Sequence, residues 1–181
     1  MSKEKVMVGM SGGIDSSVTA YMLQKEGYEV EGIYLKLHNR TDGYHESNLG
    51  YIDGVAKFLG IKYYILDLAE KFTSDVYNYF VNSYLEGTTP NPCVKCNRNI
   101  KFGAMLDFSK EHGASYLATG HYATTDGKFF YEAEDKSKDQ SYFLSQIRKE
   151  ALPYMMFPLS NYKKEDIIKL GANLDVTYKK I

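Results

Sequence analysis

Two segments of the sequence carry residue types that could do chemistry. Residues 11–16 read S-G-G-I-D-S and directly follow the apolar run V-M-V-G-M, which begins at Val6. Residues 89–102 contain both cysteines of the chain, Cys93 and Cys96, spaced as C-x-x-C. A glycine turn that opens a helix can hold a phosphate, and a cysteine thiolate is a nucleophile. The two segments therefore indicate phosphate binding together with sulfur, redox or metal chemistry.

The first segment has the order strand, glycine turn and helix start. Gly12 and Gly13 let the backbone turn tightly and approach a ligand with no Cβ in the way. The N–H groups and the positive dipole at the helix start favour an anion. Neither G-x-x-x-x-G-K-[ST] nor G-x-G-x-x-G occurs in the chain. S-G-G-x-D-S resembles the pyrophosphate loop of ATP pyrophosphatases, which adenylate a substrate and release pyrophosphate. The alternative is an ordinary βα turn, for which one glycine would suffice.

The second segment predicts a reactive thiol. Two prolines favour an extended or turning backbone, and a helix is expected to begin near Cys96. A cysteine at a helix N-terminus, flanked by Lys95, Arg98 and Lys101, should have a lowered pKa, so that thiolate is available near neutral pH. The alternatives are a redox pair or half of a zinc site. A closed zinc site needs four ligands, and the chain has no second C-x-x-C.

Alternating strands and helices must position these segments. Strands are expected at residues 6–8, 30–37, 61–68 and 115–119. Helices are expected from residue 14 to Gly27, from about residue 49 to Gly60, at 70–86 and at 100–112. This alternation predicts an α/β fold, a parallel sheet with helices on both faces. Ligands of such sheets bind beyond the carboxyl ends of the strands, where the glycine loop, Leu35 and Gly120 all fall.

Two further expectations concern residues 38–47, which precede the second helix, and the helix at 70–86. Residues 38–47 are polar and are expected to form a loop. The helix at 70–86 is expected to bury one apolar stripe, made of Phe72, Val76, Phe80 and Tyr84.

The pattern changes after residue 121. Asp126-Gly127 is a strong hairpin signal between residues 122–125 and 128–134. A short helix is expected at 141–147. A last helix would be capped by Ser160 or Asn161 and ended by Gly171. We therefore predict a nucleotide-binding domain at residues 1–121 and a hairpin and helical extension at residues 122–181.

Composition sets the class of protein. The chain has 181 residues, of which 44% are hydrophobic and 25% charged, as expected for one globular domain. Its net charge is −1, so contact with nucleic acid must rest on a local basic patch. No apolar run approaches the roughly 20 residues of a membrane span, and the N-terminus lacks a signal-peptide core. With two cysteines a disulfide framework is not expected, and the cytoplasm is the natural compartment.

Four motifs occur in order along the chain: S-G-G-I-D-S, T-P-N-P-C-V-K-C-N-R-N-I-K-F, A-T-G-H-Y-A and K-D-Q-S-Y-F-L. Together they resemble tRNA-specific 2-thiouridylase, the bacterial enzyme that thiolates the wobble uridine of certain tRNAs. The resemblance runs from about residue 5 to about residue 158. It implies an adenine nucleotide alpha-hydrolase-like fold, use of ATP with Mg²⁺, and a tRNA substrate. It also implies a sulfur-donor protein, either a persulfide carrier or a cysteine desulfurase, and no membrane partner.

The resemblance assigns roles by position. The residues expected to bind the nucleotide are Gly9, Met10, Ser11, Gly12, Gly13, Ile14, Asp15, Ser16, Leu35 and Gly120. Cys96 aligns with the nucleophilic cysteine, and Asp15 is also placed among the catalytic residues. Those expected to contact the tRNA are Asn91, Pro92 and Cys93 at the target base, with Lys138, Asp139 and Gln140. No residue is assigned to a metal. For His121, a structural hydrogen bond is at least as expected as catalysis.

The chain departs from the family in two ways. Some members carry Asp at the position of Cys93. The family's second catalytic cysteine should follow a segment resembling T-Y-K, but this chain stops at T-Y-K-K-I, and the central and C-terminal β domains are missing. We therefore expect an N-terminal catalytic part that adenylates the uracil C2 oxygen but lacks the second cysteine for persulfide transfer. The alternatives are a nucleotide- or tRNA-binding module and another adenylating ATP pyrophosphatase. Two cysteines alone do not support an iron–sulfur cluster.

Overall fold

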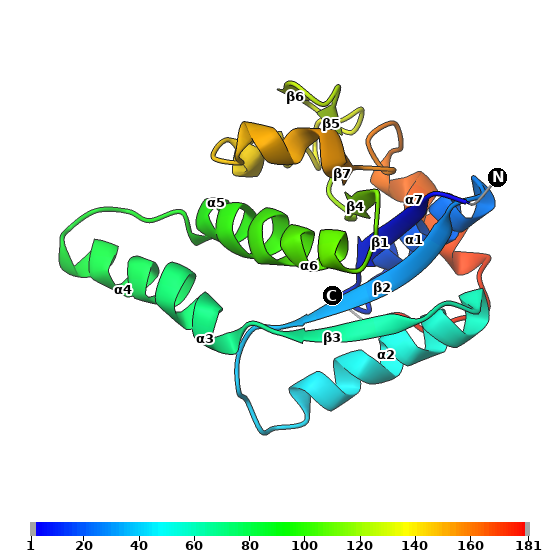
Figure 1. Cartoon of the computed structure of the whole chain (residues 1–181), viewed down its shortest axis with the longest axis horizontal. Coiled ribbons are helices and arrows are strands. Elements are labelled where there is room, and N and C mark those ends of the chain that lie inside the picture. Colours follow the sequence, from blue (N-terminus) through cyan, green and yellow to red (C-terminus); the bar gives the residue numbers. More distant parts are fainter. Residues whose placement is uncertain (1–2, 180–181) are drawn as a thin grey trace.

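A five-stranded parallel sheet forms the centre of the fold (Figure 1). The computed structural model describes residues 3–179, so the expected chain end at Ile181 lies outside the described residues. The strand order is β3-β2-β1-β4-β7, and every neighbouring pair is parallel, as predicted. The strands are β1 (Lys5–Gly9), β2 (Glu29–Lys36), β3 (Tyr63–Asp67), β4 (Tyr116–Ala118) and β7 (Met155–Met156).

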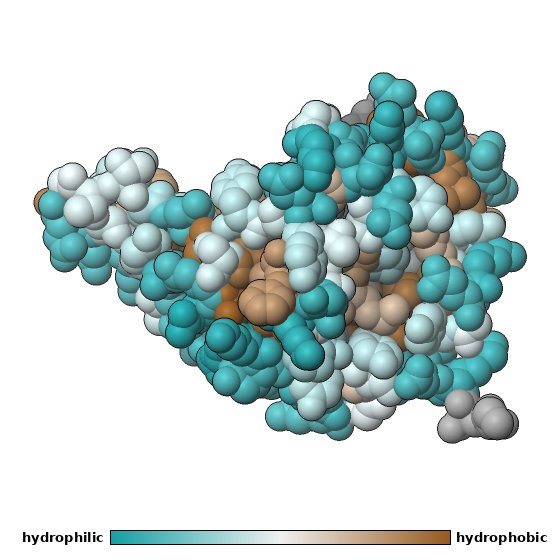
Figure 2. Space-filling view, turned by 90° about the horizontal axis from the view of Figure 1, so that it is seen from above, coloured by the Kyte–Doolittle hydropathy of each residue, from teal (hydrophilic) through white to brown (hydrophobic). Residues whose placement is uncertain are grey.

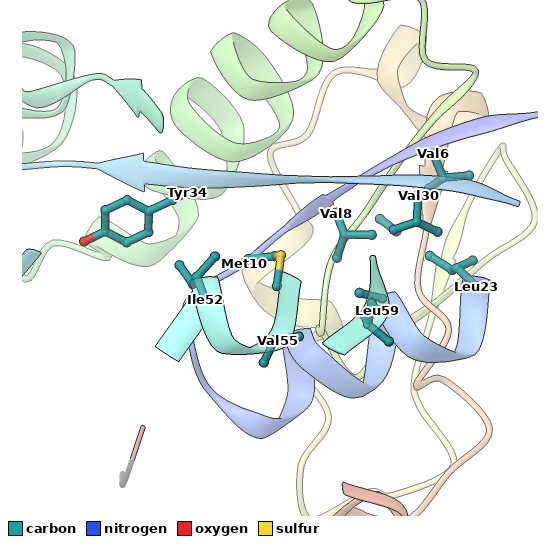
Figure 3. Close-up of a cluster of buried hydrophobic side chains, with 11 residues drawn as sticks. Val6, Val8, Met10, Leu23, Val30, Tyr34, Ile52, Val55 and Leu59 are labelled. Carbon is teal, nitrogen blue, oxygen red and sulfur yellow. The ribbon is translucent and has the colours of Figure 1, made fainter. Parts of the chain in front are cut away.

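Helices cover both faces of this sheet and bury the side chains of β1 on both sides. Val6 and Val8 point to the face covered by α1 (Ile14–Lys25) and α2 (Tyr44–Leu59), as Figure 3 shows. Met7 points to the opposite face, where it packs in the cluster that includes Met105. Side chains of a strand alternate between its faces, so one apolar run can serve two cores. The predicted α/β architecture is confirmed.

One continuous helix carries the cysteine segment. It comprises α5 (Pro92–Cys96), a π-helical segment (Asn97–Ala104) and α6 (Met105–Glu111). Its N-cap is Asn91, whose Oδ1 accepts the N–H of Val94 at 3.3 Å. Proline is tolerated in the first turn, where its missing N–H is not needed. The prediction that the helix begins near Cys96 is therefore wrong, since Cys96 lies a full turn inside it.

A second helical stretch projects from the sheet as an arm. It consists of α3 (Ala69–Phe72), a π-helical segment (Thr73–Tyr77) and α4 (Asn78–Leu85), and it forms the narrow end of the molecule in Figure 2. The helix was predicted, but the buried stripe is only partly correct. Val76 is buried, whereas Phe80 is 38% and Tyr84 56% exposed. The arm leaves the sheet, so its outer half has no core to face.

The helix α7 (Lys164–Ala172) packs on α1 through a small apolar cluster. The predicted caps Ser160 and Asn161 are wrong, because the first helical N–H, that of Lys164, donates to Asp135 Oδ2 at 2.9 Å from a distant loop. Gly171 does not end the helix but lies within it. A Cβ there would lie 2.5 Å from Ile14 Cδ1, so glycine is needed for the close approach of the two helices.

The remaining elements are short. The predicted hairpin is confirmed as β5 (Thr124–Thr125) paired antiparallel with β6 (Phe130–Tyr131). Residues expected in a short helix form a 3₁₀ turn (Ser141–Leu144), and another lies at Lys149–Tyr154. The first turn of α2 lies inside the expected polar loop 38–47, and β7 was not predicted because two residues between prolines show no periodicity. Across residues 3–179, no helix combines the length and apolarity needed to cross a membrane.

Candidate active site

A pocket of about 460 Å³ opens at the carboxyl ends of β1, β2 and β4. This is the edge of the sheet at which a parallel α/β fold binds ligands. The structure brings seven of the predicted nucleotide-binding residues to its wall, namely Gly9, Met10, Ser11, Asp15, Ser16, Leu35 and Gly120. The other three, Gly12, Gly13 and Ile14, belong to the same loop but do not line the pocket.

The loop between β1 and α1 is held in one conformation by its own hydrogen bonds. Ser16 Oγ accepts the N–H of Ser11 at 3.2 Å and donates to the carbonyl of Gly13 at 3.1 Å. Gly12 has a φ of +79°, in the left-handed region that glycine adopts without strain. Gly13 is the N-cap of α1 and has no side chain to cap it. The first N–H groups of the helix are therefore available to an anion.

Asp15 lies in the first turn of α1 and is held from two other parts of the chain. Lys164 Nζ lies 2.5 Å from Asp15 Oδ1, and the Tyr122 hydroxyl donates to the same oxygen at 3.1 Å. Burial and the Asp15 charge raise the pKa of Tyr122, so this hydroxyl stays a neutral donor. Lys164 also places a cation beside the loop. No sequence signal indicated it, because Lys164 is 149 residues away from its partner.

Gly120 lets the loop after β4 lie against the first turn of α1. A Cβ at this position would be 3.0 Å from the backbone carbon of Asp15 and 3.1 Å from the backbone nitrogen of Ser16. Only a residue without a side chain allows this approach, which brings Gly120 into the same wall as the glycine loop.

We expect Gly120→Ala to lower ATP affinity about tenfold while the protein stays folded, because overpacking costs about 1–3 kcal/mol. Calorimetric titration with ATP measures the loss. Gly54→Ala is the matched control, since Gly54 lies in α2 with nothing within 4 Å of an added Cβ. The control should keep full affinity and raise stability by roughly 0.5–1 kcal/mol. Equal affinity for the two variants would contradict the role of Gly120.

A second group of side chains closes the far wall of the pocket. Lys101 and His121 both line it, and Lys101 Nζ lies 3.4 Å from His121 Nε2. His121 Nδ1 lies 2.8 Å from Thr119 Oγ1. Burial and the Lys101 charge lower the pKa of His121 to about 3, so the ring is neutral at physiological pH. Nε2 then accepts from Lys101, and Nδ1–H donates to Thr119. His121 thus makes the expected hydrogen bond.

The cysteines differ in their surroundings. Cys93 is exposed and Cys96 is half-buried, and neither forms a disulfide. Burial raises the pKa of Cys96, and the positive charge of Lys101 opposes this effect. The expected low pKa is therefore wrong, because Cys96 lies inside the helix and its desolvation outweighs the nearby charge.

The residues predicted to contact the tRNA are spread over two segments. Asn91 and Lys138 are exposed, and Pro92 occupies the first turn of α5. Asp139 Oδ1 accepts the N–H of Ala133 at 2.9 Å. Gln140 Oε1 accepts the N–H of Tyr122 at 3.1 Å and also lines the pocket. Contact with tRNA remains a prediction for all of them.

Several pocket residues were not expected from the sequence. His45 Nδ1 lies 2.7 Å from the Tyr34 hydroxyl, and its Nε2 lies 2.7 Å from the carbonyl of His38. At the tail of the chain, the N–H of Lys179 donates to the carbonyl of Gly12 at 2.9 Å. The segment after α7 therefore returns to the glycine loop, which no local pattern predicted.

The His, Cys, Asp and Glu side chains determine which metal ions this chain could bind. Among residues 3–179 no three His, Cys, Asp or Glu side chains lie together as metal ligands. Iron–sulfur clusters commonly take four cysteine ligands, and this chain by itself supplies two, which alone do not support a cluster. Mg²⁺ is commonly held by one or two carboxylates together with substrate phosphates. Asp15, the carboxylate on the pocket wall, fits that requirement.

Comparison with known proteins places this geometry in context. A family model described as tRNA methyl transferase HUP domain matches residues 4–180. The tRNA-specific 2-thiouridylase MnmA 1 of Aliarcobacter butzleri is 84% identical over the whole chain, which covers 52% of that protein. The tRNA-specific 2-thiouridylase MnmA of Sulfurimonas denitrificans is 54% identical over 97% of the chain, which covers 51% of it. The chain thus spans about half the length of these curated relatives.

Solved structures share the fold at low identity. A 4-thiouridine synthetase in complex with RNA and bound ATP has a TM-score of 0.68 and 19% identity, covering 95% of this chain and 41% of that one. The U34-tRNA thiolase NcsA of Methanococcus maripaludis, with its [4Fe-4S] cluster, has a TM-score of 0.62 and 22% identity, covering 98% and 58%. These likenesses show the fold alone.

Proposed function

Because the chain belongs to the tRNA methyl transferase HUP domain family, we propose that it is the ATP-binding part of a cytoplasmic tRNA-specific 2-thiouridylase. One observation carries this proposal. The glycine loop and Lys101, the residue whose charge acts on Cys96, line the same pocket. A nucleotide bound at the loop would therefore lie in the cavity that the cysteine segment closes.

The first step is adenylation of the target uridine. The phosphates of ATP bind at residues 11–16, and the adenosine lies between Leu35 and Gly120. The uracil C2 oxygen attacks the α-phosphorus, and the bond between this phosphorus and the pyrophosphate oxygen breaks. The N–H groups at the start of α1 and the cation of Lys164 stabilise the departing pyrophosphate. Bound Mg²⁺, held by Asp15 and the phosphates, would neutralise phosphate charge.

The second step is sulfur transfer. A donor protein leaves a persulfide on Cys96, and its terminal sulfur attacks C2 of the activated uracil. AMP departs, which leaves the uracil joined to Cys96 through two sulfurs. A second thiolate then attacks Cys96 Sγ, forms a disulfide with it and releases 2-thiouridine. In this family the second thiol is expected beyond the T-Y-K segment. Cys93 is the other thiol that this chain offers.

The tRNA itself is proposed to contact Asn91, Pro92 and Cys93 at the target base, and residues 122–181 through Lys138, Asp139 and Gln140. The basic surface is small. Lys101 faces the pocket, and Lys136 is paired with Glu132 at 2.9 Å. Lys95, Arg98 and Lys138 remain to meet phosphates.

We expect tRNA binding by this chain to be weak and strongly salt-dependent. With about three phosphate contacts, affinity should fall by one to two orders of magnitude between about 50 and 200 mM salt. Filter binding or fluorescence anisotropy over that range measures the slope. Lys138→Met should lower the slope by about one, whereas Lys57→Met on α2 should leave it unchanged. Tight binding that ignores salt would argue against a phosphate-based contact.

Two other functions compete with this one. A nucleotide- or tRNA-binding module would bind both ligands without chemistry, and an amide- or guanidine-forming ATP pyrophosphatase would not need a cysteine pair. The protein in its full native length should be incubated with ATP, a persulfide donor and unmodified tRNA, and the nucleosides analysed by mass spectrometry. Formation of 2-thiouridine supports the proposal. Its absence, with ATP and tRNA both bound, would support the binding module.

A further inference from the structure

The π-helical segment Asn97–Ala104 interrupts an otherwise α-helical stretch directly after Cys96. In a π-helix the N–H of residue i+5 bonds to the carbonyl of residue i, and here the N–H of Met105 donates to the carbonyl of Ile100. Residues five apart then lie on the same face of the helix, as residues three or four apart do in an α-helix. In an α-helix of 3.6 residues per turn they would be about 140° apart. Cys96 and Lys101 are five apart.

Cys96 and Lys101 are close enough for the charge of each to change the pKa of the other. Lys101 and Cys96 act on each other: the Lys101 charge lowers the pKa of Cys96, and the Cys96 charge raises the pKa of Lys101. For each group burial acts the opposite way and is the larger effect. Burial thus disfavours both the Cys96 thiolate and the Lys101 ammonium. Each charge offsets part of the cost of burying the other, and burial stays the larger effect for both groups.

Gly103 is the residue that permits the π-helical turn. A Cβ at Gly103 would lie 2.9 Å from the carbonyl oxygen of Arg98, five residues earlier. Glycine inside a helix is otherwise unfavourable, by roughly 1 kcal/mol relative to alanine. The sequence therefore accepts a poor helix former at the position where the π-helical hydrogen-bonding pattern requires it.

His121 fixes the other end of Lys101. Its neutral ring accepts from Lys101 Nζ at 3.4 Å, and Thr119 fixes the orientation of the ring. Because its pKa lies near 3, His121 cannot itself take a proton from a thiol near neutral pH. His121, on the loop after β4, therefore accepts a hydrogen bond from Lys101 and does not act as a base toward Cys96.

We propose that the π-helical segment places Lys101 beside Cys96 as its counter-ion. Lys101 is a positioning and charge-pairing residue for Cys96. This inference deepens the proposed function and rests on it only for the use to which the thiolate is put.

Other charged groups near the pair do not replace Lys101. Cys93 on α5 acts on both residues, and its negative charge would raise the pKa of Cys96. Asp75, on the π-helical segment of the arm, is already paired with Lys71 at 2.9 Å. The 3₁₀ turn that packs against the segment carries Tyr142, which is exposed. Lys101 is the cation among these groups.

The test is the pH profile of Cys96 alkylation by iodoacetamide, followed by mass spectrometry. It uses the Cys93→Ser chain, so that one thiol remains. A close opposite charge shifts a pKa by about 1–3 units, so Lys101→Met should slow alkylation near neutral pH by about tenfold or more. The rate at high pH, where the thiol is fully ionised, should not change. Lys101→Arg, which keeps the charge, should restore most of the rate.

Two further variants separate charge pairing from a structural effect. Lys110→Met removes the same charge from the exposed side of α6 and should leave the profile unchanged. Gly103→Ala should favour the α-helical pattern and slow alkylation as Lys101→Met does. If Lys101→Met fails to fold, Lys101→Gln and Gly103→Ala give the same comparison. The proposal is overturned if the Cys96 alkylation rates of the folded proteins with and without Lys101→Met agree within about twofold at every pH. Alkylation needs neither tRNA nor a sulfur donor. Its outcome therefore tests the Cys96–Lys101 pair separately from thiolation, which tests the proposed function.

Discussion

Gly12→Val should remove measurable ATP binding. Valine at a φ of +79° is strained, and its Cβ would lie 3.0 Å from Tyr51 Cβ and 3.3 Å from the carbonyl oxygen of Asn48. Left-handed backbone costs about 1–2 kcal/mol and overpacking about 1–3 kcal/mol, which together correspond to roughly a hundredfold or more in affinity. The loop would leave the conformation that presents its N–H groups to phosphate.

Calorimetry with ATP and the 181-residue chain measures this loss. Gly113→Val is the control, because Gly113 has a similar φ of +74° but nothing within 4 Å of an added Cβ. It should lower stability by a comparable strain and keep ATP affinity. Unchanged affinity in Gly12→Val would show that phosphate is not bound at this loop.

Cys96→Ser should abolish formation of 2-thiouridine by the full-length protein while pyrophosphate release from ATP continues. A hydroxyl cannot carry the persulfide, but the substitution does not touch the glycine loop, so only the second step is lost. Cys93→Ser should keep measurable thiolation if the second thiol lies elsewhere in the protein. The readouts are mass spectrometry of tRNA nucleosides and a pyrophosphate assay on the same samples.

The opposite result would assign the sulfur differently. Full thiolation by the Cys96→Ser protein would show that Cys96 is not the nucleophile. Loss of thiolation in both single variants would indicate that Cys93 acts as the second thiol. In that case alkylation of one cysteine should protect the other from forming a disulfide.

The fold was predictable from the sequence because its signals are local. Apolar runs followed by helical periodicity predicted four of the five parallel strands, and the glycines after β1 predicted the tight turn into α1. Strand β7 was missed because Met155–Met156 is too short to show a period, and its place in the sheet depends on pairing with β4. The exposed Phe80 and Tyr84 show the same limit, since periodicity predicts an apolar face but not what will cover it.

The site was predictable where a motif is continuous in the sequence, as in the glycine loop, or where a strand end and the family resemblance indicated a residue, as for Leu35 and Gly120. The residues of the glycine loop are neighbours in sequence, and seven of the ten predicted nucleotide-binding residues line the pocket. Lys164 and Lys179 reach the loop from the end of the chain, so no spacing could indicate them. Cys96 was predicted to have a low pKa because its charged neighbours were visible, whereas its burial was not. The π-helical turn that pairs it with Lys101 is likewise a property of the folded helix.

We propose that this pocket uses ATP to activate a tRNA uridine. The most direct measurement is the release of pyrophosphate and AMP from ATP by the full-length protein, with unmodified tRNA and with the same tRNA already thiolated. Pyrophosphate should appear only with unmodified tRNA and should be lost in Gly12→Val. Binding of both ligands without pyrophosphate release, or release of orthophosphate and ADP instead, would contradict it.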